Sequence, residues 1–263
     1  RFFFRLHLPH ISLPNALTMN YYNTLFGSND TAEVTSEFAE QPLLNCDNNE
    51  NGTCFLNSAV QMLNACKEFR AAICSVDTSG NKTPITHALK MLFLGQSSWR
   101  NFCASLVSTG IPKYGPGDTA RACVSLLEAV NKEVPNVASF FLFKDYEMVD
   151  QCSRCEFIDR DTRRCHTFTM PLSGDPKMCL QELVDANLTT NSYACPKCQT
   201  MLRRYNNYAL PFYVMTRVSV GEANPKMQLV LDVGNQRYKM VSIGLYTGDG
   251  KNGHCIACTR YGK

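Results

Sequence analysis

The chain has 263 residues, a formal net charge of +3 and 44% hydrophobic residues. A chain of this length can bury a real core, in one large domain or two small ones. The positive charge is too small and too evenly spread to indicate a nucleic-acid partner, and no apolar run approaches the ~20 residues that cross a membrane. Fourteen cysteines, about 5% of the chain, fall below the ~8–10% typical of disulfide scaffolds. We therefore expect reduced cysteines in a cytoplasmic or nuclear protein.

The composition of residues 1–44 predicts a flexible or non-native N-terminal segment. The apolar run after Arg1 is too short for a signal peptide and is broken by charged residues and proline. Because the first methionine is Met19, we expect residues 1–18 to be the tail of an upstream segment or translated non-coding sequence. Residues 19–44 are rich in Asn, Ser, Thr and Glu, which is typical of a flexible lead-in.

Apolar periodicity divides the rest of the chain into a helical part, a cysteine-containing part and a β part. The helical part predicts helices at 54–74, 86–94, 99–108 and 119–131. The last part predicts strands at 210–218, 227–233, 238–246 and 255–261. This order favours the α+β class.

Cys54 begins the first predicted helix, directly after a turn that contains Gly52. One apolar helical face follows it, formed by Leu56, Ala59, Val60 and Leu63. The thiol then lies near unpaired backbone N–H groups and the positive end of the helix dipole. Both favour the thiolate, which is the nucleophilic form of cysteine. The alternative interpretation is a small buried cysteine at a helix start.

Two C-x-x-C pairs lie in the middle of the chain, Cys152 with Cys155 and Cys195 with Cys198. Two such pairs supply four thiolates, which is the tetrahedral ligand set that structural Zn²⁺ prefers. The 39 residues between Cys155 and Cys195 exceed the usual gap of a zinc ribbon. A redox dithiol or two coincidental turns are the alternatives, and zinc is the better interpretation.

His254 follows Gly253 near the end of the chain and precedes a predicted strand. A cysteine at a helix start and a distant histidine on a strand suit the thiol–imidazole pair of papain-like enzymes, whose members meet only in the fold. A histidine near a strand is more often an ordinary polar residue, so the pair as a whole carries the prediction.

These segments resemble the ubiquitin-specific proteases, the papain-like deubiquitinating enzymes. Thr53 to Ser58 and Gln61 match the family's Cys box, approximately N-x-G-N-T-C-[YF]-[LM]-N-[SA]-x-[LVI]-Q. Gly253 to Ala257 is similar to the family's G-H-Y-x-A-Y His box, and Leu210 to Val218 resembles a strand of the family's palm. The resemblance covers about residues 45–263.

The resemblance implies a papain-like cysteine protease fold. It assigns a helical thumb to residues 45–145, zinc fingers to 146–208 and an incomplete antiparallel β palm to 209–263. The family's fingers are a zinc ribbon with an inserted helix, which accounts for the long gap between the two cysteine pairs. The resemblance implies that residues 178–184 form this helix and residues 168–172 the strand before it. The implied ligands of structural Zn²⁺ are Cys152, Cys155, Cys195 and Cys198.

The implied activity is thiol-dependent hydrolysis of the (iso)peptide bond at the C-terminus of ubiquitin or a ubiquitin-like modifier. Cys54 would attack the carbonyl, and His254 would take the thiol proton and return it to the leaving amine. Asn49 stands at the family's oxyanion position, and the Cys54 backbone N–H would be a second donor. Asp118 aligns with an acid that binds the substrate's extended tail, although an N-cap of the helix at 119 explains it equally well. The expected partners are ubiquitin-like proteins and their conjugates, without nucleic acid or membrane.

The chain departs from the family's pattern in several places. Gly-Asn of the Cys box appears as Asn51-Gly52, Cys255 replaces an aromatic residue, and the family's neighbours of the acid are missing around Asp118. The family's third triad residue lies farther beyond the histidine than this chain extends, so we expect Lys263 to be a truncation. Two other functions stay open: a catalytically weak ubiquitin-binding pseudo-enzyme, and a viral-type papain-like polyprotein protease.

Overall fold

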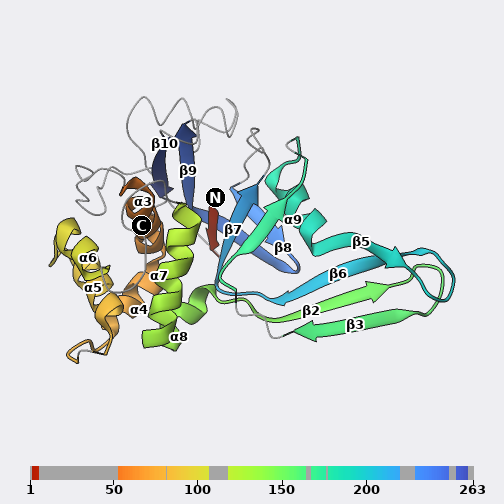
Figure 1. The fold of residues 1–263 in the computed structure, drawn as a ribbon, viewed down its shortest axis with the longest axis horizontal. Helices are drawn as coiled ribbons and strands as arrows, with labels where there is room; N and C mark the ends of the chain where they lie inside the picture. The colour runs from red at the N-terminus through yellow and green to blue at the C-terminus, as the bar shows by residue number, and fades with distance from the viewer. Residues whose placement is uncertain are drawn as a thin grey trace.

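The computed structural model describes residues 2–5, 53–80, 82–106, 118–163, 167–175, 177–219, 229–248 and 253–259. Its elements form a helical part, a central sheet and a second, longer sheet that projects away from both (Figure 1). This mixture of helices and sheets agrees with the expected α+β class. Among the described helices, none is long and apolar enough to cross a membrane.

The helical part consists of α3 (Cys54–Ala65), α4 (Lys67–Ser75), α5 (Pro84–Phe93), α6 (Trp99–Ser105), α7 (Thr119–Glu133) and α8 (Pro135–Ala138), followed by a 3-10 turn, Ser139–Phe141. Ten of the twelve residues of α3 are buried. Because a surface helix buries only one stripe, α3 is a central helix enclosed by the others and by the sheet.

The helix expected over 54–74 is two helices, because the chain bends at Cys66. This residue has an extended backbone (φ −79°, ψ 91°), and its N–H bonds to the carbonyl of Leu63 at 3.1 Å. Its buried thiol donates to the carbonyl of Met62 at 3.5 Å. The bend gives α4 a new direction, in which Phe69 and Ile73 face the core. Periodicity alone did not reveal this, since the apolar spacing continues through the bend.

Two helices of this part are joined through a carboxylate. Glu133, the last residue of α7, accepts hydrogen bonds from the first backbone N–H groups of α5, from Ile85 at 3.0 Å and from Thr86 at 2.7 Å. These N–H groups have no partner within α5, and a negative charge at a helix start is favourable. Glu133 therefore fixes α5 against α7.

The central sheet has the strand order β10-β9-β1-β7-β4, and β8 also pairs with β9. Its strands are β1 (Phe2–Arg5), β4 (Met170–Ser173), β7 (Tyr213–Ser219), β8 (Val230–Val233), β9 (Gln236–Gly248) and β10 (Gly253–Thr259). β4 runs parallel to β7, and the other pairs are antiparallel. The last four strands match the strands expected from residue 210 onward, with shifted ends.

The N-terminal strand β1 differs from the flexible or non-native segment expected at 1–44. Phe2 pairs with Thr216 of β7 on one side and with Ile243 of β9 on the other. The physical reason is that β7 and β9 do not pair with each other, so a strand between them satisfies the backbone groups of both. The correction concerns residues 2–5; the remainder of 1–44 lies outside the described residues.

The projecting sheet has the order β3-β2-β6-β5 and is antiparallel throughout. Its strands are β2 (Lys144–Gln151), β3 (Ile158–Arg163), β5 (Thr189–Ala194) and β6 (Met201–Ala209). The helix expected at 178–184 is α9 (Leu180–Leu188), which leads into β5. Asp150 of β2 is buried, and Arg204 of β6 donates to both of its oxygens, at 2.9 and 2.8 Å. This ion pair lowers the pKa of Asp150 and ties the two middle strands together.

Each face of the central sheet contributes to a separate core. Tyr213 and Met215 of β7 join the core formed with the helical part. Val214 of β7 joins a second core with Leu183 and Val184 of α9. This alternation follows from the two-residue period of a strand. The central sheet is therefore covered by the helical part on one face and by α9 on the other (Figure 1).

Candidate active site and metal centre

Cys54 is the first residue of α3, as the sequence pattern predicts. The carbonyl of the preceding residue, Thr53, accepts a hydrogen bond from the N–H of Asn57 at 2.9 Å and so starts the helix. Thr53 is buried, whereas Cys54 is partly exposed and packs at the margin of the helical core. The thiol therefore combines access from outside with a place at a helix N-terminus, where an anion is favoured.

The Cys54 thiol contacts the edge strand of the central sheet. The backbone N–H of Cys255 in β10 donates a hydrogen bond to the Sγ atom of Cys54, with 3.5 Å between N and Sγ. Among the described strands β10 pairs with β9 alone, so alternate N–H groups of β10 point away from the sheet. His254 immediately precedes Cys255 and pairs with Thr247 of β9. The two segments expected to supply a thiol–imidazole pair are thus neighbours in the fold.

A glycine in β9 permits this close packing of helices on the sheet. Gly244 pairs with Ala257 of β10. A Cβ atom at position 244 would lie 2.9 Å from Sδ of Met62 in α3 and 3.3 Å from Cγ2 of Thr119 in α7. Both distances are shorter than ordinary van der Waals contact, so a larger residue would require Met62 or Thr119 to shift. Gly244 therefore permits α3 and α7 to pack closely on β9.

Asp118 caps a helix and also forms an ion pair. Its Oδ1 atom accepts hydrogen bonds from the backbone N–H groups of Ala120 at 2.8 Å and Arg121 at 3.2 Å, at the start of α7. Its Oδ2 atom lies 3.3 Å from Nη2 of Arg217 in β7. The expected capping role is thereby confirmed. No motif signals the ion pair, because Arg217 is distant in sequence.

The structure describes the expected catalytic residues to different extents. Cys54 is described with its side chain, His254 is placed by its strand position, and Asn49 lies outside the described residues. Sequence reasoning missed the contact made by the Cys255 backbone and the role of Gly244. A glycine within a strand pattern is the one signal that could have drawn attention to position 244.

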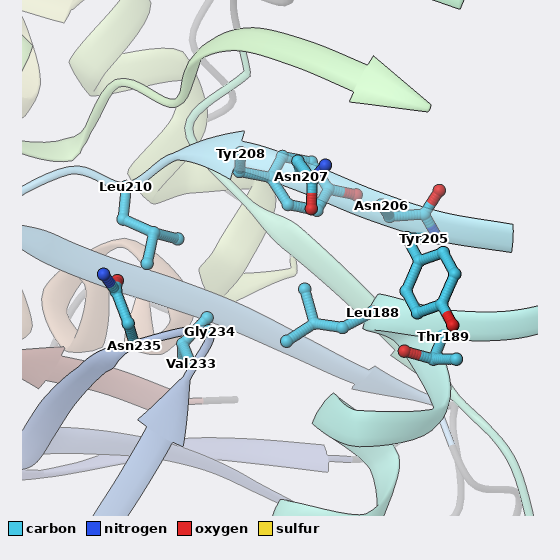
Figure 2. A pocket seen from close by; sticks show the side chains of 10 residues that line it. All are labelled: Leu188, Thr189, Tyr205, Asn206, Asn207, Tyr208, Leu210, Val233, Gly234 and Asn235. Carbon is cyan, nitrogen blue, oxygen red and sulfur yellow. The ribbon is translucent and has the colours of Figure 1, made fainter. Parts of the chain in front are cut away.

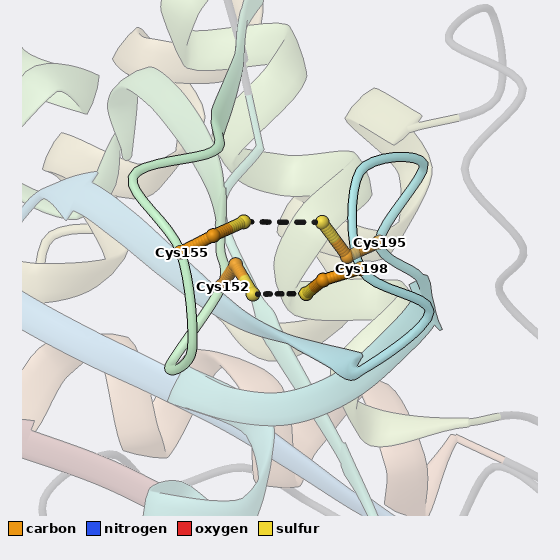
Figure 3. A group of neighbouring side chains, drawn as sticks. All are labelled: Cys152, Cys155, Cys195 and Cys198. Atoms are coloured by element: carbon orange, nitrogen blue, oxygen red, sulfur yellow. Dashed lines mark hydrogen bonds between the residues drawn. The ribbon is translucent and has the colours of Figure 1, made fainter.

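The two C-x-x-C pairs meet at one end of the projecting sheet (Figure 3). The first pair connects β2 to β3 and the second connects β5 to β6, and because β2 pairs with β6 the two turns come together. Sγ of Cys152 is 3.4 Å from Sγ of Cys198, and Sγ of Cys155 is 3.6 Å from Sγ of Cys195. All four sulfur atoms lie within 4.8 Å of one another.

This cluster could hold a metal ion, and its chemistry is consistent with zinc. Four sulfur ligands in a closed, partly buried group fit a structural Zn²⁺ site. The pKa of the Cys198 thiol is lowered to about 6, chiefly by hydrogen bonds with Thr200. In the same cluster, a backbone hydrogen bond from Phe157 lowers the pKa of Cys155, but burial and the other three thiols outweigh it and raise that pKa to about 12. Since metal ligands must lose their protons, metal binding here would weaken as the pH falls. Among the described residues, Leu202 is the one fully buried side chain that packs with the four cysteines, so apolar burial contributes little at this end of the sheet.

A hollow of about 390 Å³ lies at the base of the projecting sheet, and no motif predicted it (Figure 2). It is bordered by β6, the junction of α9 with β5, and the turn between β8 and β9. Its walls are uncharged and include the side chains of Tyr205, Tyr208, Leu188, Leu210 and Val233. The hollow is separate from the residues around Cys54.

No protein-family model matches the sequence, and no curated protein matches it either. Solved structures do match its fold. A chain of the SAGA Ubp8/Sgf11/Sus1/Sgf73 DUB module bound to ubiquitin aldehyde has a TM-score of 0.64 and 12% identity, over 94% of this chain and 69% of that chain. The same module bound to monoubiquitin gives 0.59 and 14%, over 93% and 68%.

A third match is the SAGA module with a shortened Sgf11, with a TM-score of 0.60 and 14% identity, over 92% of this chain and 65% of that chain. The chain thus spans about two-thirds of the length of the chains that it matches. At such low identity the likeness concerns the fold. The fold of this chain is therefore one that it shares with structures of a deubiquitinase module.

Proposed function

We propose that this chain is a thiol-dependent deubiquitinase, which hydrolyses the (iso)peptide bond at the C-terminus of ubiquitin or a ubiquitin-like modifier. The observation that carries the proposal is the hydrogen bond from the Cys255 backbone N–H to Cys54 Sγ. It joins the helix start that bears the candidate nucleophile to the strand that bears His254. The fold in which this happens resembles deubiquitinase structures, two of them with ubiquitin or ubiquitin aldehyde bound.

In the proposed mechanism, Cys54 attacks the carbonyl carbon of the scissile bond, and His254 accepts the thiol proton. The tetrahedral oxyanion would be held by the backbone N–H of Cys54 and the side chain of Asn49. Collapse of this intermediate breaks the C–N bond, and His254 returns the proton to the leaving amine. Water, deprotonated by His254, then hydrolyses the thioester and regenerates the thiol.

In this proposal, the backbone N–H of Cys255 also takes part in catalysis. It points at Sγ of Cys54, so it would stabilise the thiolate before attack, because hydrogen bonds to an anion are stronger than those to a neutral group. The edge position of β10 leaves this donor available, since only one side of the strand is paired with β9. The thiol is also partly exposed, so a substrate can reach it.

The proposed division of the chain is a thumb at 45–145, zinc fingers at 146–208 and a palm at 209–263. Residues 1–44 precede this domain, and of these residues 2–5 add the strand β1 to the central sheet. Zn²⁺ would be held by Cys152, Cys155, Cys195 and Cys198 and would order the end of the fingers. Its contribution would be structural, because the four thiolates leave no open coordination position for a substrate. Asp118 would bind the extended tail of the modifier. A cytoplasmic or nuclear location goes with this proposal.

The decisive experiment is reaction of the purified chain, with its metal retained, with a ubiquitin that carries a C-terminal thiol-reactive warhead. We expect a covalent adduct that is lost in Cys54→Ala and kept in Cys74→Ala, which changes a half-exposed cysteine at the end of α4. Absence of an adduct with intact ubiquitin binding would indicate a pseudo-enzyme. Cleavage of oligopeptides without any reaction with ubiquitin would indicate a polyprotein protease.

A further inference from the structure

Arg217 already binds the carboxylate that the proposed function assigns to the substrate. Oδ1 of Asp118 accepts two backbone hydrogen bonds at the start of α7, and Oδ2 lies 3.3 Å from Nη2 of Arg217. An ionised carboxylate is an acceptor only, so a substrate tail must bring a donor to it, and a cationic side chain is the strongest one. Arg217 already supplies such a cationic donor from within the chain.

The place of Arg217 follows from the alternation of β7. Met215 belongs to the core on the helical face of the sheet, whereas Val214 and Val218 pack on the opposite face. Arg217 therefore lies on the helical face, two residues beyond Met215, where α7 begins. Its side chain is 50% exposed and that of Asp118 is 23% exposed. The guanidinium can therefore move into water without opening either core.

The charges around Asp118 oppose a cationic tail while Arg217 remains in place. Among the described residues, the first turn of α7 contains Arg121 and no acidic residue, and Arg217 is paired with Asp118. These two arginines would repel a further cation that approaches Asp118. Once Arg217 swings out, the tail forms the same kind of ion pair that Arg217 gives up.

We propose that Arg217 is a positioning residue that competes with a cationic residue of the substrate's extended tail for Oδ2 of Asp118. This inference rests on the proposed function, because it assumes that the tail of a ubiquitin-like modifier passes Asp118. Arg217 then acts as a filter: a tail with a cation displaces it, and a tail without one leaves the ion pair closed. Since exposed ion pairs are weak, the competition changes the apparent affinity by no more than about fivefold.

The test compares two substrates, a ubiquitin–fluorophore conjugate and the same conjugate with its tail arginines replaced by glutamine. In Arg217→Gln we expect KM for the arginine tail to fall about two- to fivefold with unchanged kcat, and no change for the glutamine tail. Arg217→Lys, which keeps the charge, should behave like the wild-type chain. In an Asp118→Asn background, Arg217→Gln should have no further effect.

The matched control is Arg237→Gln, which removes an arginine from another exposed pair, with Asp232, at a site far from Cys54 in sequence. It should leave both constants unchanged. If KM of Arg217→Gln rises with both tails, or stays at the wild-type value, the proposed competition by Arg217 is refuted. The proposed function then still stands. A wild-type chain that does not react with the ubiquitin warhead refutes the proposed function, and this inference with it.

Discussion

The thiol of Cys54 receives a hydrogen bond from the backbone of Cys255, 201 positions later in the chain. The bond involves the main chain of Cys255, so the side chain at position 255 is not what makes it. It also satisfies an outward N–H group of an edge strand, which would otherwise need water or another chain. The same contact therefore orients the thiol of Cys54 and gives one outward N–H group of β10 a partner.

Replacing Cys255 with proline removes this N–H group, whereas alanine keeps it. Loss of a hydrogen bond to a charged sulfur corresponds to about 1.5–3 kcal/mol, so we expect Cys255→Pro to react with the ubiquitin warhead about 10- to 100-fold more slowly. Cys255→Ala should react at nearly the wild-type rate. Proline is tolerated on an edge strand when its nitrogen faces outward, and thermal unfolding of both variants checks this. Equal rates for the two variants would contradict a role of the N–H group.

Removing one thiol of the four-cysteine cluster should release the metal. We expect the purified chain to contain one zinc ion, and Cys195→Ser to lose it, together with protection of β2 and β6 against hydrogen exchange. The reason is that the end of the projecting sheet buries little apolar surface, so metal binding supplies its folding free energy. Cys103→Ser, which changes a buried cysteine of α6 outside the cluster, is the control and should keep the metal. Retention of a full equivalent in Cys195→Ser would rule out the cluster as the site.

A methyl group at position 244 should separate the helices from the sheet. Gly244→Ala is expected to destabilise the chain by about 1–3 kcal/mol, the usual cost of overpacking, and to slow the reaction of Cys54. Met62 is flexible and can absorb part of the clash, but Thr119 is branched and less able to yield. Denaturant unfolding measures the first effect and warhead labelling the second. Gly80→Ala is the control, since a Cβ there meets no atom within 4 Å; similar losses in both variants would refute the explanation.

The stability of the fold should decline at alkaline pH because of two buried tyrosines. Burial raises the pKa of Tyr213 and that of Tyr238, and the hydroxyl of Tyr213 also donates to Glu68. Both stay neutral in the folded state, whereas an unfolded tyrosine ionises at about pH 10. The stabilisation is fully present below pH 10 and is lost as the pH rises above it.

Urea unfolding at about pH 9 and about pH 11 measures this decline, and the ultraviolet absorbance of phenolate follows the ionisation itself. The double variant Tyr213→Phe/Tyr238→Phe should show a smaller decline between the two pH values than the wild-type chain. A decline of the same size in both proteins would mean that other groups cause it.

Local sequence patterns predicted the parts of the fold that depend on neighbouring residues. The apolar stripe after Cys54 gave the start of α3, and Asp118 before Thr119 gave the N-cap of α7. The spacing of each C-x-x-C pair predicted two tight turns that could share a metal, and the cluster agrees with it. The helix start and the N-cap each depend on residues that are only a few positions apart. Each C-x-x-C pair has the spacing of two ligands that bind the same ion.

The features that the sequence did not predict are contacts between distant segments. The ion pair of Arg217 with Asp118 joins a strand to a helix 99 positions earlier, and neither residue has a pattern that points to the other. The bend at Cys66 lets α4 bury Phe69 and Ile73 in the core, and the apolar spacing around position 66 does not indicate it. The hollow beside Tyr205 arises where three elements meet. The order of residues in the sequence does not show which elements will meet in the fold.

The position of β1 has a consequence for the synthesis of the protein. Phe2–Arg5 pairs with residues 213–216 and 239–243, so these four residues wait while more than two hundred others leave the ribosome. Contacts of such sequence separation form slowly, because the ends of a long loop must first meet. The aromatic run Phe2-Phe3-Phe4 therefore enters the central sheet late in folding, after β7 and β9 have been synthesised.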